Sequence, residues 1–79
     1  MPLTDPAKKL LRLLLERAPL SPEQAHQLFG GGLGAFEAAL DQLWGYVDRT
    51  ERHWGSTMEI WLEIKPSQRE RAIADMGAN

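Results

Sequence analysis

The hydrophobic pattern of this chain changes its period at one point, and the change limits the folds that the chain can adopt. Up to Gly45, apolar residues recur every three or four positions, as they do on amphipathic helices. From Tyr46 to Ile64 the period becomes two, as it is on half-buried strands, and Pro66 ends this segment. The pattern therefore predicts an α+β domain in which helices come first and a pair of strands follows.

A first helix is predicted over 7–17, with Asp5 as its N-cap and Pro6 at its first position. Apolar side chains cover an arc of roughly 200° on this helix; they are Leu10, Leu11, Leu13, Leu14 and Leu15. One core contact needs less than this arc. Two explanations remain open: a C-terminal helix covers the excess, or Leu11 and Leu15 contact a partner protein.

The second and third helices are separated by three consecutive glycines. Ser21, Pro22 and Gln24 form a capping box that starts a helix running to about Phe29, with Ala25 and Leu28 inward. Gly30–Gly32 then form a turn in which positive φ angles are needed. The third helix is predicted over 33–45. Its core stripe repeats at three-four spacing through Leu33, Phe36, Leu40, Leu43 and Val47, and Trp44 is expected to be partly in the core.

Two strands, 46–54 and 57–64, are joined at Gly55-Ser56, which suits a two-residue type II′ turn. Met58, Ile60 and Leu62 share one face of the hairpin, and Trp54 and Trp61 lie on the opposite face. A last helix over 67–76 starts at a second capping box, Ser67 to Glu70. Its thin apolar stripe (Ala72, Ile73 and Met76) cannot be stable alone, so we expect it to dock on the leucines of the first helix.

This order of elements resembles the winged helix-turn-helix superfamily, which includes the MarR-like and other small bacterial or phage regulators. The residues that carry the resemblance are Leu10, Leu20, Ser21, Ala25, Leu28, the glycines, Phe36, Leu40, Leu43 and Val47. The resemblance covers about Ala7 to Ile64. It implies a single winged-helix domain over 1–79, with a helix-turn-helix core and hairpin wing in 7–64 and a short C-terminal helix in 67–76.

The charge distribution departs from that of DNA-binding members of this superfamily. The chain has no lysine or arginine from Ala18 to Asp48. In DNA-binding members the third helix enters the major groove, and its side chains contact bases and phosphates. Here the outer face of this helix carries Glu37 and Asp41, which would repel phosphate, and only Gln42 is a usual base reader. We therefore predict that this acidic recognition helix does not read DNA.

Two sets of residues are candidates for a binding site. Trp54, Trp61 and Arg52 share one face of the wing, and tryptophan and arginine are enriched at protein interfaces. With Leu11 and Leu15 they form the predicted contact surface for a protein partner or a homodimer, unless the C-terminal segment covers the tryptophans. DNA binding, which we disfavour, would use cations of the wing and the first helix: Arg49, Arg52, His53, Lys8, Lys9 and Arg12.

The functional prediction is a regulatory or inhibitory protein–protein interaction module. The alternatives are a DNA-binding transcriptional regulator that uses the wing and first helix, and a phage-type antagonist of a nucleic-acid-processing complex. No enzyme is predicted, since the chain lacks cysteine and a supported nucleophile–base set. Two histidines without cysteine do not predict a metal site, and no cofactor is expected. The absence of a long apolar run predicts a cytoplasmic protein without membrane contact.

Overall fold

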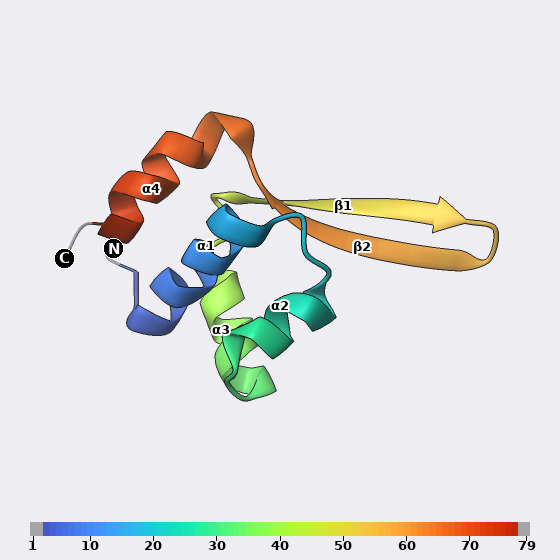
Figure 1. The fold of residues 1–79 in the computed structure, drawn as a ribbon, viewed down its shortest axis with the longest axis horizontal. Helices are drawn as coiled ribbons and strands as arrows, with labels where there is room; N and C mark the ends of the chain where they lie inside the picture. Colours follow the sequence, from blue (N-terminus) through green and yellow to red (C-terminus); the bar gives the residue numbers. More distant parts are fainter. Residues whose placement is uncertain (1–2, 78–79) are drawn as a thin grey trace.

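The computed structural model describes residues 3–77, so the first two and last two residues of the predicted domain lie outside the described residues. Three helices come first, an antiparallel hairpin follows, and a fourth helix ends the described chain (Figure 1). Their bounds are α1 (Asp5–Arg17), α2 (Pro22–Phe29), α3 (Leu33–Asp41), β1 (Val47–Trp54), β2 (Thr57–Ile64), a 3₁₀ turn (Pro66–Gln68) and α4 (Arg69–Gly77). The predicted α+β class and order of elements are confirmed.

The N-cap of α1 lies one residue earlier than predicted, and the helix begins at Asp5. Thr4, not Asp5, is the N-cap, because its side chain accepts a hydrogen bond from the backbone N–H of Ala7. Asp5 is the first helical residue, where its negative charge favours the positive end of the helix dipole. Thr4 is itself held by the side chain of Gln42, whose Nε2 donates to the Thr4 hydroxyl at 3.0 Å.

The helix-turn-helix segment follows the local signals closely. Ser21 and Gln24 form the predicted capping box, and α2 ends at Gly30, whose φ of 78° is left-handed. Inward packing differs from the prediction at two leucines. Leu28 is exposed while its neighbour Phe29 is buried, and Leu33, in the first turn of α3, is 58% exposed.

α3 ends at Asp41, four residues before the predicted end at Gly45. The chain continues in tight turns, in which Leu43 donates its backbone N–H to Leu40 and Tyr46 donates to Leu43. This tighter winding rotates Trp44 outward, so its predicted core position is wrong, whereas Leu43 and Tyr46 are buried.

The hairpin that we call the wing comprises β1, β2 and the turn at Gly55-Ser56. Its register pairs Trp54 with Thr57, so the turn has two residues as predicted. Gly55 has a φ of 60° and Ser56 does not have a positive φ, as a type II′ turn requires. The base of the wing is joined to the helices by an isolated bridge, in which Leu20 and Leu62 exchange two backbone hydrogen bonds of 2.7 and 3.1 Å.

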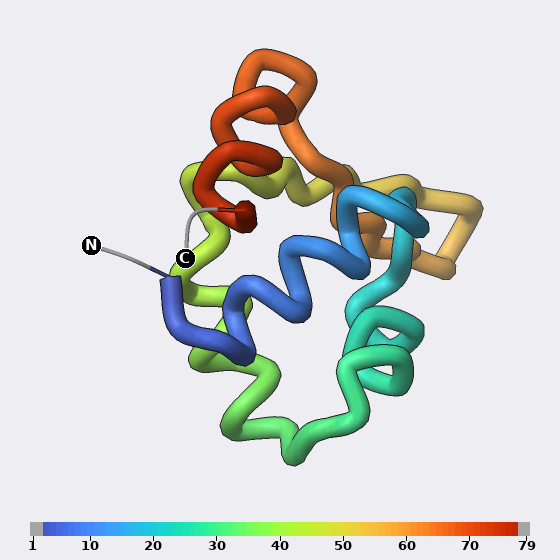
Figure 2. Tube along the Cα trace, turned by 60° about the vertical axis from the view of Figure 1, so that its left-hand side comes forward, coloured from blue at the N-terminus to red at the C-terminus, as the bar shows by residue number. Residues whose placement is uncertain are grey.

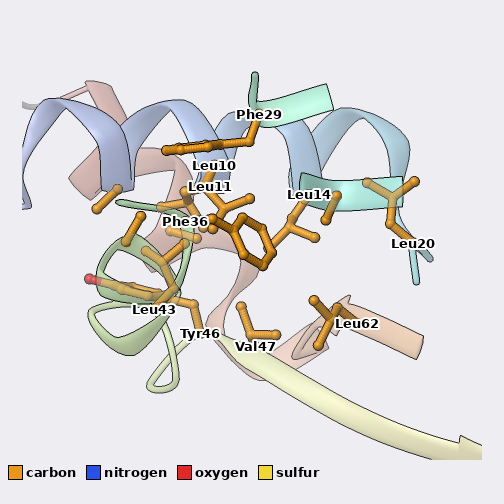
Figure 3. Packing of buried hydrophobic residues seen from close by; sticks show 14 residues of the cluster. Leu10, Leu11, Leu14, Leu20, Phe29, Phe36, Leu43, Tyr46, Val47 and Leu62 are labelled. Carbon is orange, nitrogen blue, oxygen red and sulfur yellow. The ribbon is translucent and has the colours of Figure 1, made fainter. Parts of the chain in front are cut away.

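The buried apolar residues form one cluster with α1 at its centre (Figure 3). α2 and α3 pack on one side of α1, and α4 packs on another (Figure 2). The cluster comprises Ala7, Leu10, Leu11, Leu14, Leu20, Ala25, Phe29, Phe36, Ala39, Leu43, Tyr46, Val47, Leu62 and Ala72. The wide leucine arc of α1 is therefore explained by helices that contact it from several directions.

α4 docks on α1 as predicted, through buried Ala72 and partly buried Met76. Two details of the prediction are wrong. Ser67 caps no helix, because it lies inside a 3₁₀ turn that has no side-chain cap. Ile73 is exposed, because a nine-residue helix with one docked stripe leaves its other sides in solvent.

A polar contact joins α4 to the end of the α3–β1 connection. The hydroxyl of Tyr46 donates a hydrogen bond to the carboxylate of Asp75, and the Arg71 guanidinium lies 3.7 Å from the same carboxylate and 5.6 Å from the centre of the Tyr46 ring. The pKa of Tyr46 is raised above its ordinary value by the hydrogen bond to Asp75, by burial and by the negative charge of Asp75. The positive charge of Arg71 acts in the opposite direction and lowers this pKa.

We expect Tyr46→Phe to lower the free energy of unfolding at neutral pH by about 1 kcal/mol, because it removes a hydrogen bond to a charged acceptor. Since the folded-state pKa of Tyr46 is raised, its stabilising contribution is complete below the unfolded-state pKa and is lost as the pH rises through the folded-state pKa. Urea unfolding at neutral and increasingly alkaline pH should thus show the two proteins converging.

Ile73→Ala is the matched control on the same helix, because the Ile73 side chain is exposed. It should change the free energy of unfolding by no more than about 0.5 kcal/mol. If wild type and Tyr46→Phe lost stability in parallel at alkaline pH, the contact with Asp75 would not contribute as described.

Candidate protein-interaction surface

The wing extends away from the helices, and its far end is exposed on both faces (Figure 1). We call residues 53–58 the wing tip. Trp54 is 63% exposed and Met58 is 51% exposed. Trp54 is opposite Thr57, and Met58 is opposite His53 in the next pair, so the two large apolar side chains lie on opposite faces of the tip. The tip therefore presents an aromatic ring and a thioether to solvent.

Trp61 lies on the Trp54 face, nearer the helices, and is partly buried. Its indole Nε1 donates a hydrogen bond to Oε2 of Glu59 at 3.3 Å. An open groove of about 470 Å³ lies between this part of β2 and the start of α2. Its lining comprises Ser21, Pro22, Glu23, Met58, Glu59, Ile60 and Trp61. The groove is continuous with the wing tip through Met58.

The described part of the C-terminal segment, up to Gly77, leaves Trp54 uncovered. α4 packs on α1, and Trp54 keeps most of its surface exposed. The hairpin register places Arg52 between the two tryptophans on the same face, since Arg52 is opposite Glu59 and Trp61 is opposite Thr50. The structure thus brings Trp54, Trp61 and Arg52 together.

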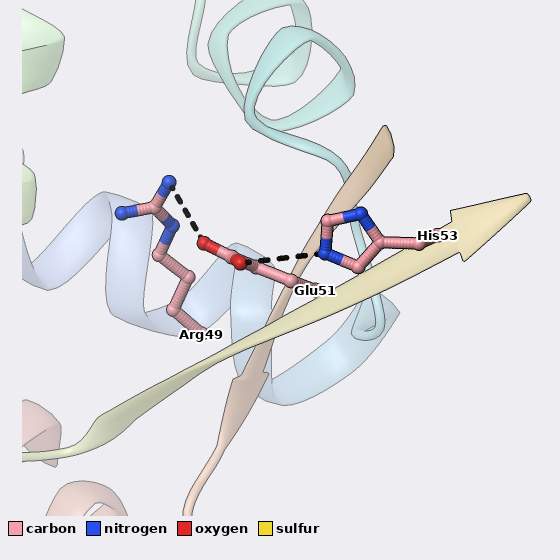
Figure 4. Close-up of polar contacts among 3 residues, drawn as sticks. All are labelled: Arg49, Glu51 and His53. Atoms are coloured by element: carbon pink, nitrogen blue, oxygen red, sulfur yellow. Dashed lines mark ion pairs between the residues drawn. The ribbon is translucent and has the colours of Figure 1, made fainter. Parts of the chain in front are cut away.

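The cations on the other face of the wing are offset by a carboxylate (Figure 4). Nη2 of Arg49 lies 3.5 Å from one oxygen of Glu51, and Nε2 of His53 lies 3.9 Å from the other. All three side chains are exposed, so each ion pair contributes little to stability. The Glu51 carboxylate does reduce the positive potential that the Arg49 guanidinium could offer to phosphate.

Lys8, Lys9 and Arg12 precede the last turn of α1 and lie toward the end of the helix remote from the wing tip (Figure 1), whereas Arg17 is in the last turn. The Lys9 ammonium lies 5.6 Å from the centre of the Phe29 ring, in a cation–π contact. Arg12 is exposed and Lys8 is partly buried. The six residues predicted for DNA binding therefore form two separate groups rather than one basic surface.

The exposed residues of α3 are acidic, small or, at Leu33, apolar. Glu37 and Asp41 are exposed, together with Gly34, Ala35 and Ala38. Gln42, the usual base reader at the end of this helix, is engaged elsewhere, because its amide bonds Thr4 at the start of α1. α3 thus offers neither a cation nor an unengaged amide at the positions where the resemblance would place DNA contacts.

Of the two leucines predicted as part of a partner surface, Leu11 lies in the core. Leu11 is 0% exposed and belongs to the core, so its assignment to a binding site is wrong. Leu15 is partly buried and packs against the same core. The reason is that other elements of the chain contact α1 on several sides. The arc of leucines alone did not show whether these elements or a partner protein would cover it.

Sequence reasoning missed Met58 as an exposed residue of the candidate surface. Alternation places Met58 on the same face as Leu62, which is buried. The wing extends beyond the helices (Figure 1), so this face loses its cover before the strand ends. The eight-residue length of each strand was the available signal, because two such strands reach beyond a small three-helix core.

Two further features, a metal site and a membrane span, were sought in the described part of the chain. Residues 3–77 contain no cluster of histidine and acidic side chains that could hold a metal ion. None of the helices within this range has the length and apolar character needed to cross a bilayer.

Comparison with known proteins yields no relative: no family model, curated sequence or solved structure matches the chain.

Proposed function

We propose that the chain is a small winged-helix module with a regulatory role that binds a protein through the wing and does not read DNA through α3. The observation that carries this proposal is the exposure of Trp54 and Met58 at the end of a hairpin that extends away from the helices. Water-exposed aromatic and methionine side chains at one site are typical of protein interfaces.

The winged-helix part of the proposal is supported by the order of elements and by two local contacts. Gly30 provides the left-handed turn between α2 and α3. The bonds between Leu20 and Leu62 fix the wing against the helix-turn-helix segment. This arrangement would present α3 and the wing as the two projecting elements.

Protein binding is favoured over DNA binding by electrostatics. A DNA-binding surface gains most of its affinity from lysine and arginine near phosphates. Here α3 contributes Glu37 and Asp41, and Glu51 lies beside Arg49 and His53. Arg52 is opposite Glu59. Lys8, Lys9 and Arg12, the α1 cations considered for DNA binding, precede the last turn of the helix and lie away from the wing tip.

Site-specific photocrosslinking in the native cell tests the proposal. A photoreactive phenylalanine analogue at position 54 should give a discrete crosslinked product with another protein. The same analogue at position 73, an exposed apolar position on α4, should not. Trp54→Ser should then weaken binding to that purified protein by about 30-fold, as expected for an interface hot spot.

Trp44→Ser is the matched control, since Trp44 is an exposed tryptophan outside the wing. It should leave the affinity unchanged. A titration with mixed-sequence duplex DNA tests the DNA-binding alternative. Tight binding with a steep salt dependence that is lost in Arg49→Ala/Arg52→Ala would replace the proposal with the DNA-binding alternative.

A further inference from the structure

The outer edge of β1 is open. β1 pairs with β2 along its whole length, and Leu20 pairs with the far side of β2. Within residues 3–77 no strand pairs with the other edge of β1. An open strand edge presents unpaired N–H and C=O groups and is a template for a strand from another chain.

The hydrogen bonds of β2 identify which residues of β1 face this edge. Leu62 exchanges both backbone hydrogen bonds with Leu20, so its N–H and C=O point away from β1. Opposed residues in an antiparallel pair alternate between bonded and non-bonded positions. Arg49 is opposite Leu62 and therefore directs its own N–H and C=O outward. The same alternation directs the backbone groups of Glu51 and His53 outward.

The charges along β1 are complementary to the same strand reversed. A second copy paired antiparallel with this edge must align outward-facing residues with one another. If Thr50 is opposite Thr50 of the second copy, Arg49 aligns with Glu51 and Asp48 aligns with Arg52 of that copy. Moving the two-fold axis by one residue would oppose Glu51 to Glu51 or Arg49 to Arg49. Since like charges placed directly opposite destabilise a sheet, the charges favour the register centred on Thr50.

A like-charge pair inside the wing supports the same arrangement. Asp48 is directly opposite Glu63, and neither carboxylate has an ion-pair partner among residues 3–77. This juxtaposition destabilises the isolated hairpin. Pairing around Thr50 would bring Arg52 of the second copy beside Asp48 and would relieve the repulsion.

We propose that β1 pairs with β1 of a second copy, antiparallel and centred on Thr50, so that two wings form one four-stranded sheet. The pairing uses the backbone edge of β1, whereas the proposed protein partner uses Trp54 and Met58. The two proposals can therefore be tested independently. Absence of the dimer would not affect the crosslink expected at Trp54, and absence of that crosslink would not affect the dimer.

Sedimentation velocity over a wide range of protein concentration gives the first test. The wild type should dimerise, and Glu51→Arg should weaken the dimer at least about tenfold, because it opposes two pairs of arginines across the two-fold axis. Arg49→Glu/Glu51→Arg exchanges the two charges and should restore the wild-type affinity. Glu23→Arg, at an exposed position of α2, is the control and should have no effect. A monomer at every concentration, or a dimer that Glu51→Arg does not weaken, would overturn the proposal.

A single cysteine tests the register, because the chain has none of its own. Thr50→Cys places two thiols opposite each other at a non-bonded pair, with Cα atoms about 4.5 Å apart, within the range of a disulfide. Under mild oxidation it should form a covalent dimer rapidly. His53→Cys is the control on the same strand, since its two copies would lie roughly 20 Å apart. Equal crosslinking rates for the two variants would exclude the register centred on Thr50.

Discussion

We expect Leu11→Ala to lower the free energy of unfolding by about 3 kcal/mol, measured by urea denaturation at neutral pH. Leu11 is fully buried where α1 contacts the rest of the core, so its truncation removes apolar contacts and leaves a cavity. A domain of this size has only a few kcal/mol of net stability. The variant is therefore expected to be partly unfolded at room temperature.

Two leucines provide controls of graded burial for this experiment. Leu15 is partly buried and packs against the core, so Leu15→Ala should cost about 1 kcal/mol. Leu33 is exposed, so Leu33→Ala should change stability by less than about 0.5 kcal/mol. If Leu11→Ala instead left stability unchanged and abolished binding to a partner, Leu11 would belong to an interface rather than to the core.

The second large effect is a gain of function. We expect Glu37→Lys/Asp41→Lys to bind mixed-sequence duplex DNA at least about tenfold more tightly than wild type at low salt, as measured by fluorescence anisotropy. Both side chains are exposed on α3, which under the proposed winged-helix arrangement corresponds to the helix that enters the major groove in DNA-binding members. The substitutions replace repulsion of phosphate with attraction, so the gain should disappear as the salt concentration rises.

A variant with the same net charge separates position from charge. Glu16→Lys/Glu70→Lys makes the same charge change at exposed positions on α1 and α4. It should give a smaller gain in affinity and a weaker salt dependence than the α3 variant. Equal gains in both variants would show that net charge alone governs DNA binding, and that α3 is not presented to the duplex.

The elements that were predicted correctly have signals confined to neighbouring residues. The capping box of Ser21 and Gln24 fixes the start of α2, and the left-handed Gly30 fixes its end. The two-residue turn at Gly55 fixes the register of the whole wing. Each signal depends on backbone geometry within a few residues, so no tertiary contact was needed to interpret it.

The errors concern which side of an element faces the core, and these depend on distant parts of the chain. Leu11 is buried in a core cluster that also contains Ala72 of α4, more than fifty residues away. Trp44 turns outward because α3 ends in tighter turns at Asp41. Met58 is exposed because the wing extends beyond the helices. A periodic pattern gives the direction of each side chain along its element but not the extent of the neighbouring surface.

The candidate surface was predicted in part. Trp54, Trp61 and Arg52 share a face because strand alternation and turn length determine this directly. The separation of Lys8, Lys9 and Arg12 from the wing tip could not be predicted in the same way, since it depends on the angle at which the wing leaves the helical body. That angle is a property of packed elements.

The two hydrogen bonds between Leu20 and Leu62 also have a mechanical consequence. They join the connection between α1 and α2 to β2 at the point where the wing leaves the helices, and Leu62 is buried there. A force applied to Trp54 therefore acts on a wing whose base is fixed to the helices, and not on one that rotates freely about a flexible connection. Torque from anything that grips the far end of the hairpin is delivered to the junction of α1 and α2.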